Sequence, residues 1–247
     1  MIESAARRVA QAGLPTRYGT FEMFVYETPE HKEHVALTLG AIDDGWPVLV
    51  RAHSECLTGD VLGSSRCDCG EQLADSLRFL QQQDRGILLY LRQEGRGIGL
   101  TKKISAYALQ EQGLDTVEAN LALGLPEDMR DYRAAAEMLL DLGVRRVRLL
   151  TNNPAKIEGL ERYGVEVVER ISLGMSPNPS NLRYLRTKRE KMGHLFPEPM
   201  TLAVAGEDRV DENDRHLGRC QNGCKLPAGS HPLRRRPDPR RPYREPG

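Results

Sequence analysis

Long apolar segments are scarce in this 247-residue sequence, and that scarcity bears on where the protein resides. The apolar runs, such as Gly86–Leu91, have the length of buried strands and fall far short of the roughly 20 residues of a membrane helix. The first residues form no apolar signal segment either. We therefore expect a soluble, cytoplasmic protein with no membrane partner.

An excess of charge of either sign is also missing. Lys and Arg together number 35, as do Asp and Glu, so the formal net charge is zero. Nucleic-acid-binding domains usually carry a basic excess, and we expect no nucleic acid partner. A Walker A loop is absent, and Gly95, Gly97 and Gly99 alternate instead of forming a G-x-G-x-x-G fingerprint. Two common nucleotide-binding loops are therefore excluded.

Cysteines are few, but three of them lie close together. The total of five is odd, which does not suit a disulfide framework and favours a reducing compartment. Cys56, Cys67 and Cys69 could bind zinc and leave one tetrahedral position for water, as catalytic zinc sites do. Two alternatives stay open: His53 could complete a closed, structural Cys3His site, or the cluster could bind no metal. From the known types of zinc site we favour the open site, and with it hydrolysis.

The hydrophobic pattern changes near residue 70. Short apolar stretches between Gly and Pro turns predict antiparallel strands before it, such as 20–26 and 34–39, which lead to a strand at 46–51. After it, strands and helices alternate, with helices at about 71–83, 100–112, 131–142 and 154–163 and strands at 86–91, 145–150 and 165–170. The expected fold class is α/β, with a mixed central sheet flanked by helices and an N-terminal antiparallel strand region.

Polar segments follow three of the predicted strands. They are 53–56, 92–99 and 151–156, and open α/β sheets place their ligands at the carboxyl ends of strands. The glycines of 92–99 precede a helix, and the capping residues of 151–156 announce another, so two helix N-termini could receive an anion. An ordinary capped helix with a surface Lys156 is the alternative for the second. Beside the cysteines, the pair favours a polyphosphate substrate.

The last part of the chain differs in composition. Residues 197–247 hold eight of the 15 prolines, and residues 219–247 hold eight Lys and Arg against two acids. Such a segment cannot bury enough surface to offset its ordering entropy, so we expect a disordered tail after a catalytic domain of residues 1–196. Cys220 and Cys224 lie in this tail, where we expect free thiols.

Seven segments together resemble the GTP cyclohydrolase II family, which opens the purine ring of GTP at the start of riboflavin synthesis. They are His53-Ser-Glu-Cys-Leu-Thr-Gly-Asp60, Arg66-Cys-Asp-Cys-Gly70, Arg92-Gln-Glu-Gly-Arg96, Asp115-Thr-Val-Glu-Ala-Asn120, Asp128-x-Arg-Asp131, Leu149-Leu-Thr-Asn-Asn-Pro154 and Lys191-Met-Gly-His194. The resemblance covers about residues 6 to 196, in order.

The resemblance implies a hydrolase with defined site residues. Cys56, Cys67 and Cys69 would bind one zinc per subunit, C8 of guanine would leave as formate, and pyrophosphate would be released to give a diamino-ribosylamino-pyrimidinone phosphate. Magnesium would accompany the triphosphate of GTP, and the chain would form a homodimer. The positions that align with GTP contacts are Arg51, Ala52, His53, Ser54, Glu55, Gln72, Glu94, Gly95, Arg96, Thr116, Thr151 and Lys156.

Three further positions align with catalytic residues of the family. Asp128 matches its proton acceptor, Arg130 its proposed nucleophile toward the α-phosphate, and Tyr107 the tyrosine of the members that release formate. A guanidinium has no free lone pair at neutral pH, so clamping the phosphate is the simpler task for Arg130. A zinc bound by three thiolates is a weak Lewis acid, and we expect a nearby cation such as Arg66 to compensate.

The sequence also leads us to expect a monofunctional enzyme, because only about fifty residues precede the zinc motif and the butanone-phosphate synthase domain of bifunctional relatives is missing. The alternative from another functional class is a zinc-stabilised nucleotide-binding or regulatory protein without turnover, whose signature would be the closed Cys3His site.

Overall fold

The computed structural model describes residues 4–126, 128–174 and 177–196. The predicted tail of residues 197–247, with Cys220 and Cys224, lies outside the described residues. Within the described part, each helix is too short or too polar to cross a membrane.

A seven-stranded mixed sheet forms the centre of the fold. Its strands follow the spatial order β1-β2-β3-β5-β4-β6-β7, in which β1, β2, β3 and β5 pair antiparallel and β5, β4, β6 and β7 pair parallel. The bounds are β1 (Arg7–Thr16), β2 (Gly19–Glu27), β3 (Glu33–Leu39), β4 (Val48–Ser54), β5 (Gly86–Leu91), β6 (Arg146–Leu150) and β7 (Glu166–Ile171). The expected α/β class and mixed sheet are confirmed.

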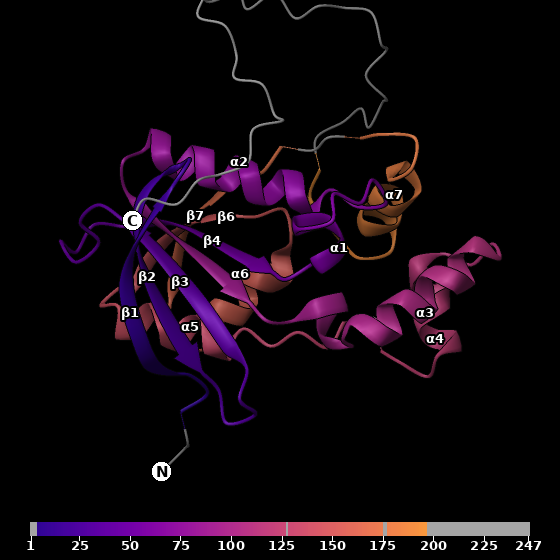
Figure 1. The fold of residues 1–247 in the computed structure, drawn as a ribbon, viewed down its shortest axis with the longest axis horizontal. Helices are drawn as coiled ribbons and strands as arrows, with labels where there is room; N and C mark the ends of the chain where they lie inside the picture. Colours follow the sequence, from indigo (N-terminus) through magenta and orange to yellow (C-terminus); the bar gives the residue numbers. More distant parts are fainter. Residues whose placement is uncertain (1–3, 127, 175–176, 197–247) are drawn as a thin grey trace, which may run out of the picture. The chain divides into compact units, whose positions relative to one another are not determined.

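Helices cover both faces of the central strands, so the residues of β4 divide between two cores. Val48, Val50 and Ala52 pack with α5 (Arg133–Asp141) and α6 (Pro154–Glu161), whereas Leu49 packs toward α2 (Cys69–Gln82). Figure 1 shows α2 on one side of the sheet and α5 and α6 on the other. Strands buried on both faces become continuously apolar, as Gly86–Leu91 is in β5.

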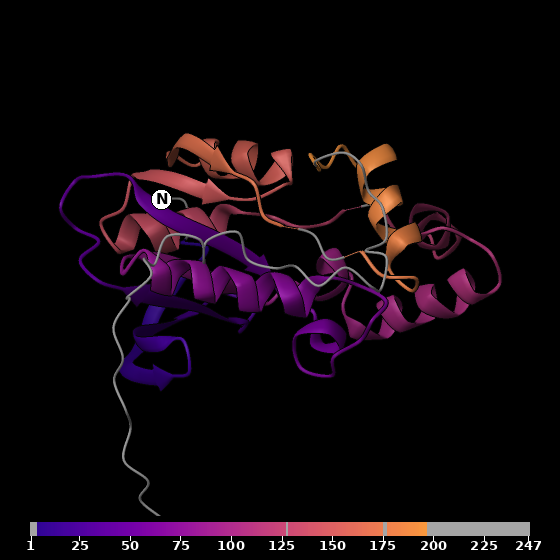
Figure 2. The ribbon, with the colours of Figure 1, turned by 90° about the horizontal axis from the view of Figure 1, so that it is seen from above.

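The carboxyl ends of β4, β5 and β6 meet at one edge, because these strands are parallel neighbours. The polar segments predicted to converge there do so. Four helical segments and a 3-10 turn complete that region: α1 (Leu57–Asp60), η1 (Glu94–Gly97), α3 (Leu100–Glu111), α4 (Thr116–Ala122) and α7 (Leu182–Glu190). Figure 2 shows α3, α4 and α7 gathered at the end of the molecule opposite β1–β3.

Two features differ from the sequence prediction. β4 continues through Ser54 instead of ending at residue 51, so His53 belongs to the strand and not to the loop after it. The elements β1, α1, α4 and α7 were also not named from the sequence. α4 begins at a complete capping box, in which Asp115 accepts from the Glu118 N–H and the Glu118 side chain accepts from the Asp115 N–H.

Candidate functional site

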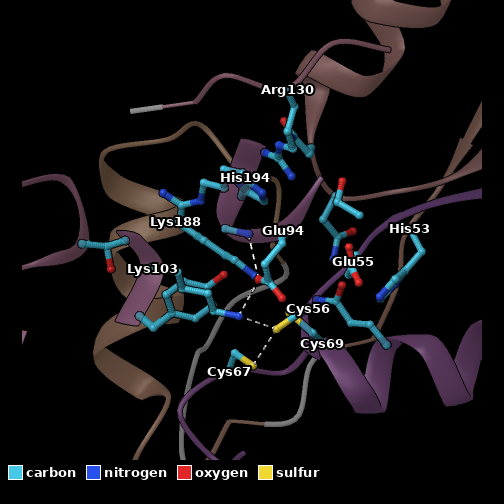
Figure 3. A pocket seen from close by; sticks show the side chains of 18 of the residues that line it. His53, Glu55, Cys56, Cys67, Cys69, Glu94, Lys103, Arg130, Lys188 and His194 are labelled. Carbon is cyan, nitrogen blue, oxygen red and sulfur yellow. Dashed lines mark hydrogen bonds and ion pairs between the residues drawn. The ribbon is translucent and has the colours of Figure 1, made fainter. Parts of the chain in front are cut away.

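The three cysteines come from adjacent turns at the end of β4. Cys56 precedes α1, and Cys69 begins α2, so the short connection between the two helices brings Cys67 back toward Cys56. Their sulfur atoms lie within 4.8 Å of one another, and Cys56 Sγ is 3.7 Å from Cys67 Sγ. Tetrahedral zinc with Zn–S bonds of about 2.3 Å places its sulfur ligands about 3.8 Å apart. The donor set therefore fits zinc in both chemistry and spacing (Figure 3).

His53 is not a member of this sulfur cluster. Its Nε2 lies 3.1 Å from Asp60 Oδ1, and its ring stacks on Tyr90 with centroids 5.5 Å apart. Asp60 also accepts from the Tyr90 hydroxyl and from the Cys56 N–H, both at 2.9 Å. Among the described residues, the group with converging metal-ligand atoms contains the three cysteines alone. This arrangement favours an open site over the closed Cys3His alternative.

Lys103 is the cation that contacts the sulfur cluster. Its Nζ donates to Cys56 Sγ at 3.1 Å, to Thr58 Oγ1 at 2.9 Å and to Glu94 Oε1 at 2.8 Å. Burial opposes the charged form, but the hydrogen bond to Glu94 raises the pKa of Lys103 above its ordinary value. Lys103 is thus a nearby cation of the expected kind, while Arg66, the example named from the sequence, pairs with Glu111 at 2.8 Å.

Hydrogen bonding among the three sulfurs separates their acidities. The hydrogen bond from Cys67 lowers the pKa of Cys56, and the positive charge of Lys103 acts in the same direction. The same bond to Cys56 raises the pKa of Cys67 to about 11, and bonds to its neighbours together with burial raise that of Cys69. In the metal-free protein, Cys56 is therefore the most acidic of the three thiols.

The sulfurs face a cavity of about 140 Å³ that is partly open to solvent. Two of its lining residues, Glu55 and Glu94, are carboxylates, against six Arg and Lys residues. The residues expected from the sequence that line it are Arg51, His53, Ser54, Glu55, Cys56, Cys67, Cys69, Gln72, Glu94, Gly95, Arg96, Tyr107, Thr116, Arg130, Thr151 and Lys156. This excess of cations suits an anionic ligand.

Ala52 and Asp128 do not line the cavity but contact residues that do. The carbonyl of Ala52 accepts from Lys156 Nζ at 2.6 Å. Asp128 forms an ion pair with Arg130, whose Nε lies 2.9 Å from Asp128 Oδ1. Burial opposes ionisation of Asp128, yet the hydrogen bond from Arg130 lowers its pKa below the ordinary value. A carboxylate stabilised in this way is a weak base, and it fixes the direction of the guanidinium.

The buried cations Arg51 and Lys156 line the cavity. Arg51 donates to the Leu150 carbonyl at 3.0 Å and to Gln72 Oε1 at 2.8 Å, and burial lowers its pKa to about 10. Lys156 is 5% exposed, and burial, together with the charges of Arg51 and Arg130, lowers its pKa well below the ordinary value. A bound anion would relieve this desolvation and repulsion.

Arg96 occupies an unusual backbone conformation beside the cavity. Its φ is 62°, in the left-handed region that non-glycine residues rarely adopt. Within the described part of the chain, its two terminal guanidinium nitrogens are buried and make no hydrogen bond. Strained residues with unsatisfied polar atoms are typical of ligand sites. Arg96 therefore presents two unused donors to whatever the cavity binds.

Tyr107 lies one helical turn after Lys103 on α3, and its ring is close to two cations. Arg66 Cζ is 4.6 Å and Lys103 Nζ is 5.8 Å from the ring centre. Burial raises the pKa of Tyr107 to about 12, so the hydroxyl stays protonated at neutral pH. It can donate a hydrogen bond to a group in the cavity.

Among the titratable side chains that line the cavity, sequence reasoning missed Lys103, Tyr184, Lys188 and His194. Lys103 could have been found, because it precedes Tyr107 by four residues and such pairs share one helical face. Tyr184 and Lys188 lie on the unpredicted helix α7, and nothing in the local pattern there indicates a site. His194 belongs to a segment quoted for the family resemblance, without an assigned role.

Comparison with known proteins gives one consistent family. A family model for GTP cyclohydrolase II matches residues 7–172. The GTP cyclohydrolase-2 of Neisseria gonorrhoeae is 59% identical over 190 residues, covering 77% of this chain and 96% of that protein. The GTP cyclohydrolase-2 of Actinobacillus succinogenes is 56% identical over 215 residues, covering 87% and 93%.

A longer relative matches over part of its length. The riboflavin biosynthesis protein RibBA of Salinispora arenicola is 56% identical over 213 residues, which cover 83% of this chain and 51% of that protein. The chain thus spans about half the length of the RibBA relatives that it matches. On the matched range, and on the high identity to two proteins covered almost entirely, this chain belongs to the GTP cyclohydrolase II family.

Proposed function

We propose that this protein is a zinc-dependent GTP cyclohydrolase II, which opens the imidazole ring of guanine in GTP and releases formate and pyrophosphate. The observation that carries the proposal is that metal-binding sulfurs and cationic side chains line the same cavity. Three sulfurs spaced for zinc face the same space as six Arg and Lys side chains. Hydrolytic chemistry and binding of a polyphosphate would therefore take place on one substrate.

Cys56, Cys67 and Cys69 would hold the zinc ion. The chemistry that zinc supplies when bound to three protein ligands is acidification of a coordinated water near neutral pH. Lys103, through its contact with Cys56, supplies positive charge next to the thiolates. Glu94 in turn holds Lys103 and accepts from the Leu57 N–H at 2.7 Å, so this cluster is connected to the backbone of α1.

The cations of the cavity suit the triphosphate. Arg96 offers two unused guanidinium nitrogens, and Arg130, held by Asp128, is oriented toward the same space. A planar guanidinium can bind phosphate oxygens through two hydrogen bonds and stabilise the charge that develops on them. We propose that Arg130 clamps the phosphate, and that Asp128 positions it in the free protein.

Tyr107 is relevant to whether formate is released from the opened ring. A neutral phenol in the cavity can donate to the formyl group of the opened ring, which supports complete release of formate. Magnesium on the triphosphate, a homodimeric assembly and a cytoplasmic location stay predictions from the resemblance and from the sequence.

The test is a product assay with matched cysteine variants. The zinc-loaded protein is incubated with GTP and magnesium, and formate and pyrophosphate are quantified. Both products are expected from the wild type and from Cys220→Ser, which makes the same change outside the described residues. Both should fall at least about a thousandfold in Cys67→Ser, in keeping with the loss of a catalytic metal ligand.

Two other results of this product assay would change the interpretation. Pyrophosphate without formate would indicate a formylated product. Neither product from the wild type, with zinc bound at one ion per chain, would contradict the proposal and favour the nucleotide-binding alternative.

A further inference from the structure

The wall of the cavity extends beyond the range matched by the family model, which ends at residue 172. Tyr184, Lys188, His194 and Phe196 all line it. The segment that carries them is anchored to the rest of the site, because the Leu195 N–H donates to the Asn152 carbonyl at 2.8 Å and Leu185 is fully buried. Figure 3 shows Lys188 and His194 in the same pocket as the cysteines and Arg130.

Lys188 is buried but only partly satisfied. It is 8% exposed, and its Nζ donates to Asp68 Oδ1 at 3.0 Å. An ammonium group has three N–H donors, and among the described residues this is the one hydrogen bond that Nζ makes. The other oxygen of Asp68 accepts from Gln72 Nε2 at 2.5 Å, so the carboxylate is shared. Lys188 thus retains donors for a ligand.

The surroundings of Lys188 are electropositive. The Tyr184 ring has Lys188 Nζ at 4.3 Å from its centre and Arg96 Cζ at 5.9 Å, so it places the two cations on one part of the wall. Burial lowers the pKa of His194 to about 3, and the charges of Lys188, Arg130 and Arg96 act in the same direction. Asp68 and Asp128 are each already paired with one of these cations. The region therefore carries more positive than negative charge, which favours an anionic ligand.

We propose that Lys188 of α7 is a phosphate-binding residue, held in place by Asp68, so that the segment 182–196 belongs to the substrate site. The ligand class is a polyphosphate such as the triphosphate of a purine nucleotide. Identification of that nucleotide as GTP rests on the proposed function, but the phosphate chemistry does not. Because Asp68 lies between Cys67 and Cys69, the ion pair also connects the phosphate subsite to the loop that carries the sulfurs.

The test compares Lys188→Met with Arg186→Met in the full chain by calorimetric titration of GTP, guanosine and inorganic tripolyphosphate. Arg186 is exposed on the same helix and serves as the matched control. Loss of a charge-assisted hydrogen bond predicts that Lys188→Met weakens GTP and tripolyphosphate binding about 10- to 100-fold. Guanosine affinity and zinc content should stay within about twofold of the wild type, as should all affinities of Arg186→Met.

If Lys188→Met fails to fold, a double variant still tests the proposal. Lys188→Met strands the buried Asp68 carboxylate, whereas Asp68→Asn/Lys188→Met removes both charges and should fold while showing the same loss for tripolyphosphate. Unchanged binding of GTP and tripolyphosphate by a folded variant, or equal weakening of guanosine, would overturn the proposal. Wild-type protein that binds tripolyphosphate but not GTP would contradict the proposed function and leave Lys188 as a phosphate ligand.

Discussion

Replacing Lys103 by methionine should destabilise the protein far more than the same change at the neighbouring Lys102. Lys103 is 8% exposed, and both its side chain and that of Glu94 are 10% accessible. Methionine preserves the length of the side chain but leaves the Glu94 carboxylate buried without its cation. Breaking such a buried pair costs about 3 to 5 kcal/mol. Lys102 is exposed, and its loss should change the free energy of unfolding by at most about 0.5 kcal/mol.

The assay is urea unfolding of metal-free, reduced protein, followed by circular dichroism, so that metal binding does not contribute. For a chain of this size the expected loss corresponds to a melting temperature lower by roughly 6 to 20 °C. A double variant isolates the cause. Lys103→Met/Glu94→Gln carries no stranded carboxylate and can still accept from the Leu57 N–H, so it should recover more than half of the lost stability.

Two results would refute this reasoning. If Lys103→Met lost no more stability than Lys102→Met, the hydrogen bonds of Lys103 would be replaceable by solvent. If Glu94→Gln restored nothing in the double variant, the cost would come from packing and not from the unpaired charge.

Further predictions concern Gly59 beside the cysteines, the buried His34 and the removal of zinc. A Cβ on Gly59 would lie 2.8 Å from Cys67 Sγ, so Gly59→Ala should weaken zinc binding at least about tenfold in a competition titration, whereas Gly174→Ala, which has open space, should not. Burial lowers the pKa of His34 to about 4, so its stabilising contribution is complete above about pH 6.5 and is lost as the pH falls toward 4. His34→Asn, which retains an acceptor for the Arg92 N–H, should remove up to about 3 kcal/mol of that pH dependence in unfolding titrations; an unchanged slope would contradict the assignment. Chelation of zinc should abolish formate release, readdition should restore it, and the far-ultraviolet circular dichroism should stay constant throughout.

The metal centre was predictable because its ligands lie close in the sequence. Cys67 and Cys69 are separated by one residue and Cys56 precedes them by one loop, so short-range spacing already restricts them to one place. The edge of the sheet was predictable for a similar reason, since β5 is a continuous apolar run followed directly by polar residues.

The contribution of α7 depends instead on a tertiary contact. Lys188 and Asp68 are 120 residues apart, and no local pattern in α7 indicates that its lysine is buried. The contact of Lys103 with the cysteines has the same origin. Arg66 is adjacent to Cys67 in sequence, but its side chain leaves the loop for Glu111, while Lys103 reaches Cys56 from another helix.

The carboxylate of Asp60 joins three parts of the molecule at the metal loop. It accepts from His53 on β4, from Tyr90 on β5 and from the backbone of Cys56, and it is 2% accessible. Small zinc domains fold only as the ion binds, because nothing else orders their ligands. Here the strands of a large core order the loop through Asp60, so the three cysteines would already be in position before the ion binds. Metal exchange should consequently be a local, reversible event, and substitution by cobalt a practical spectroscopic probe of the intact protein.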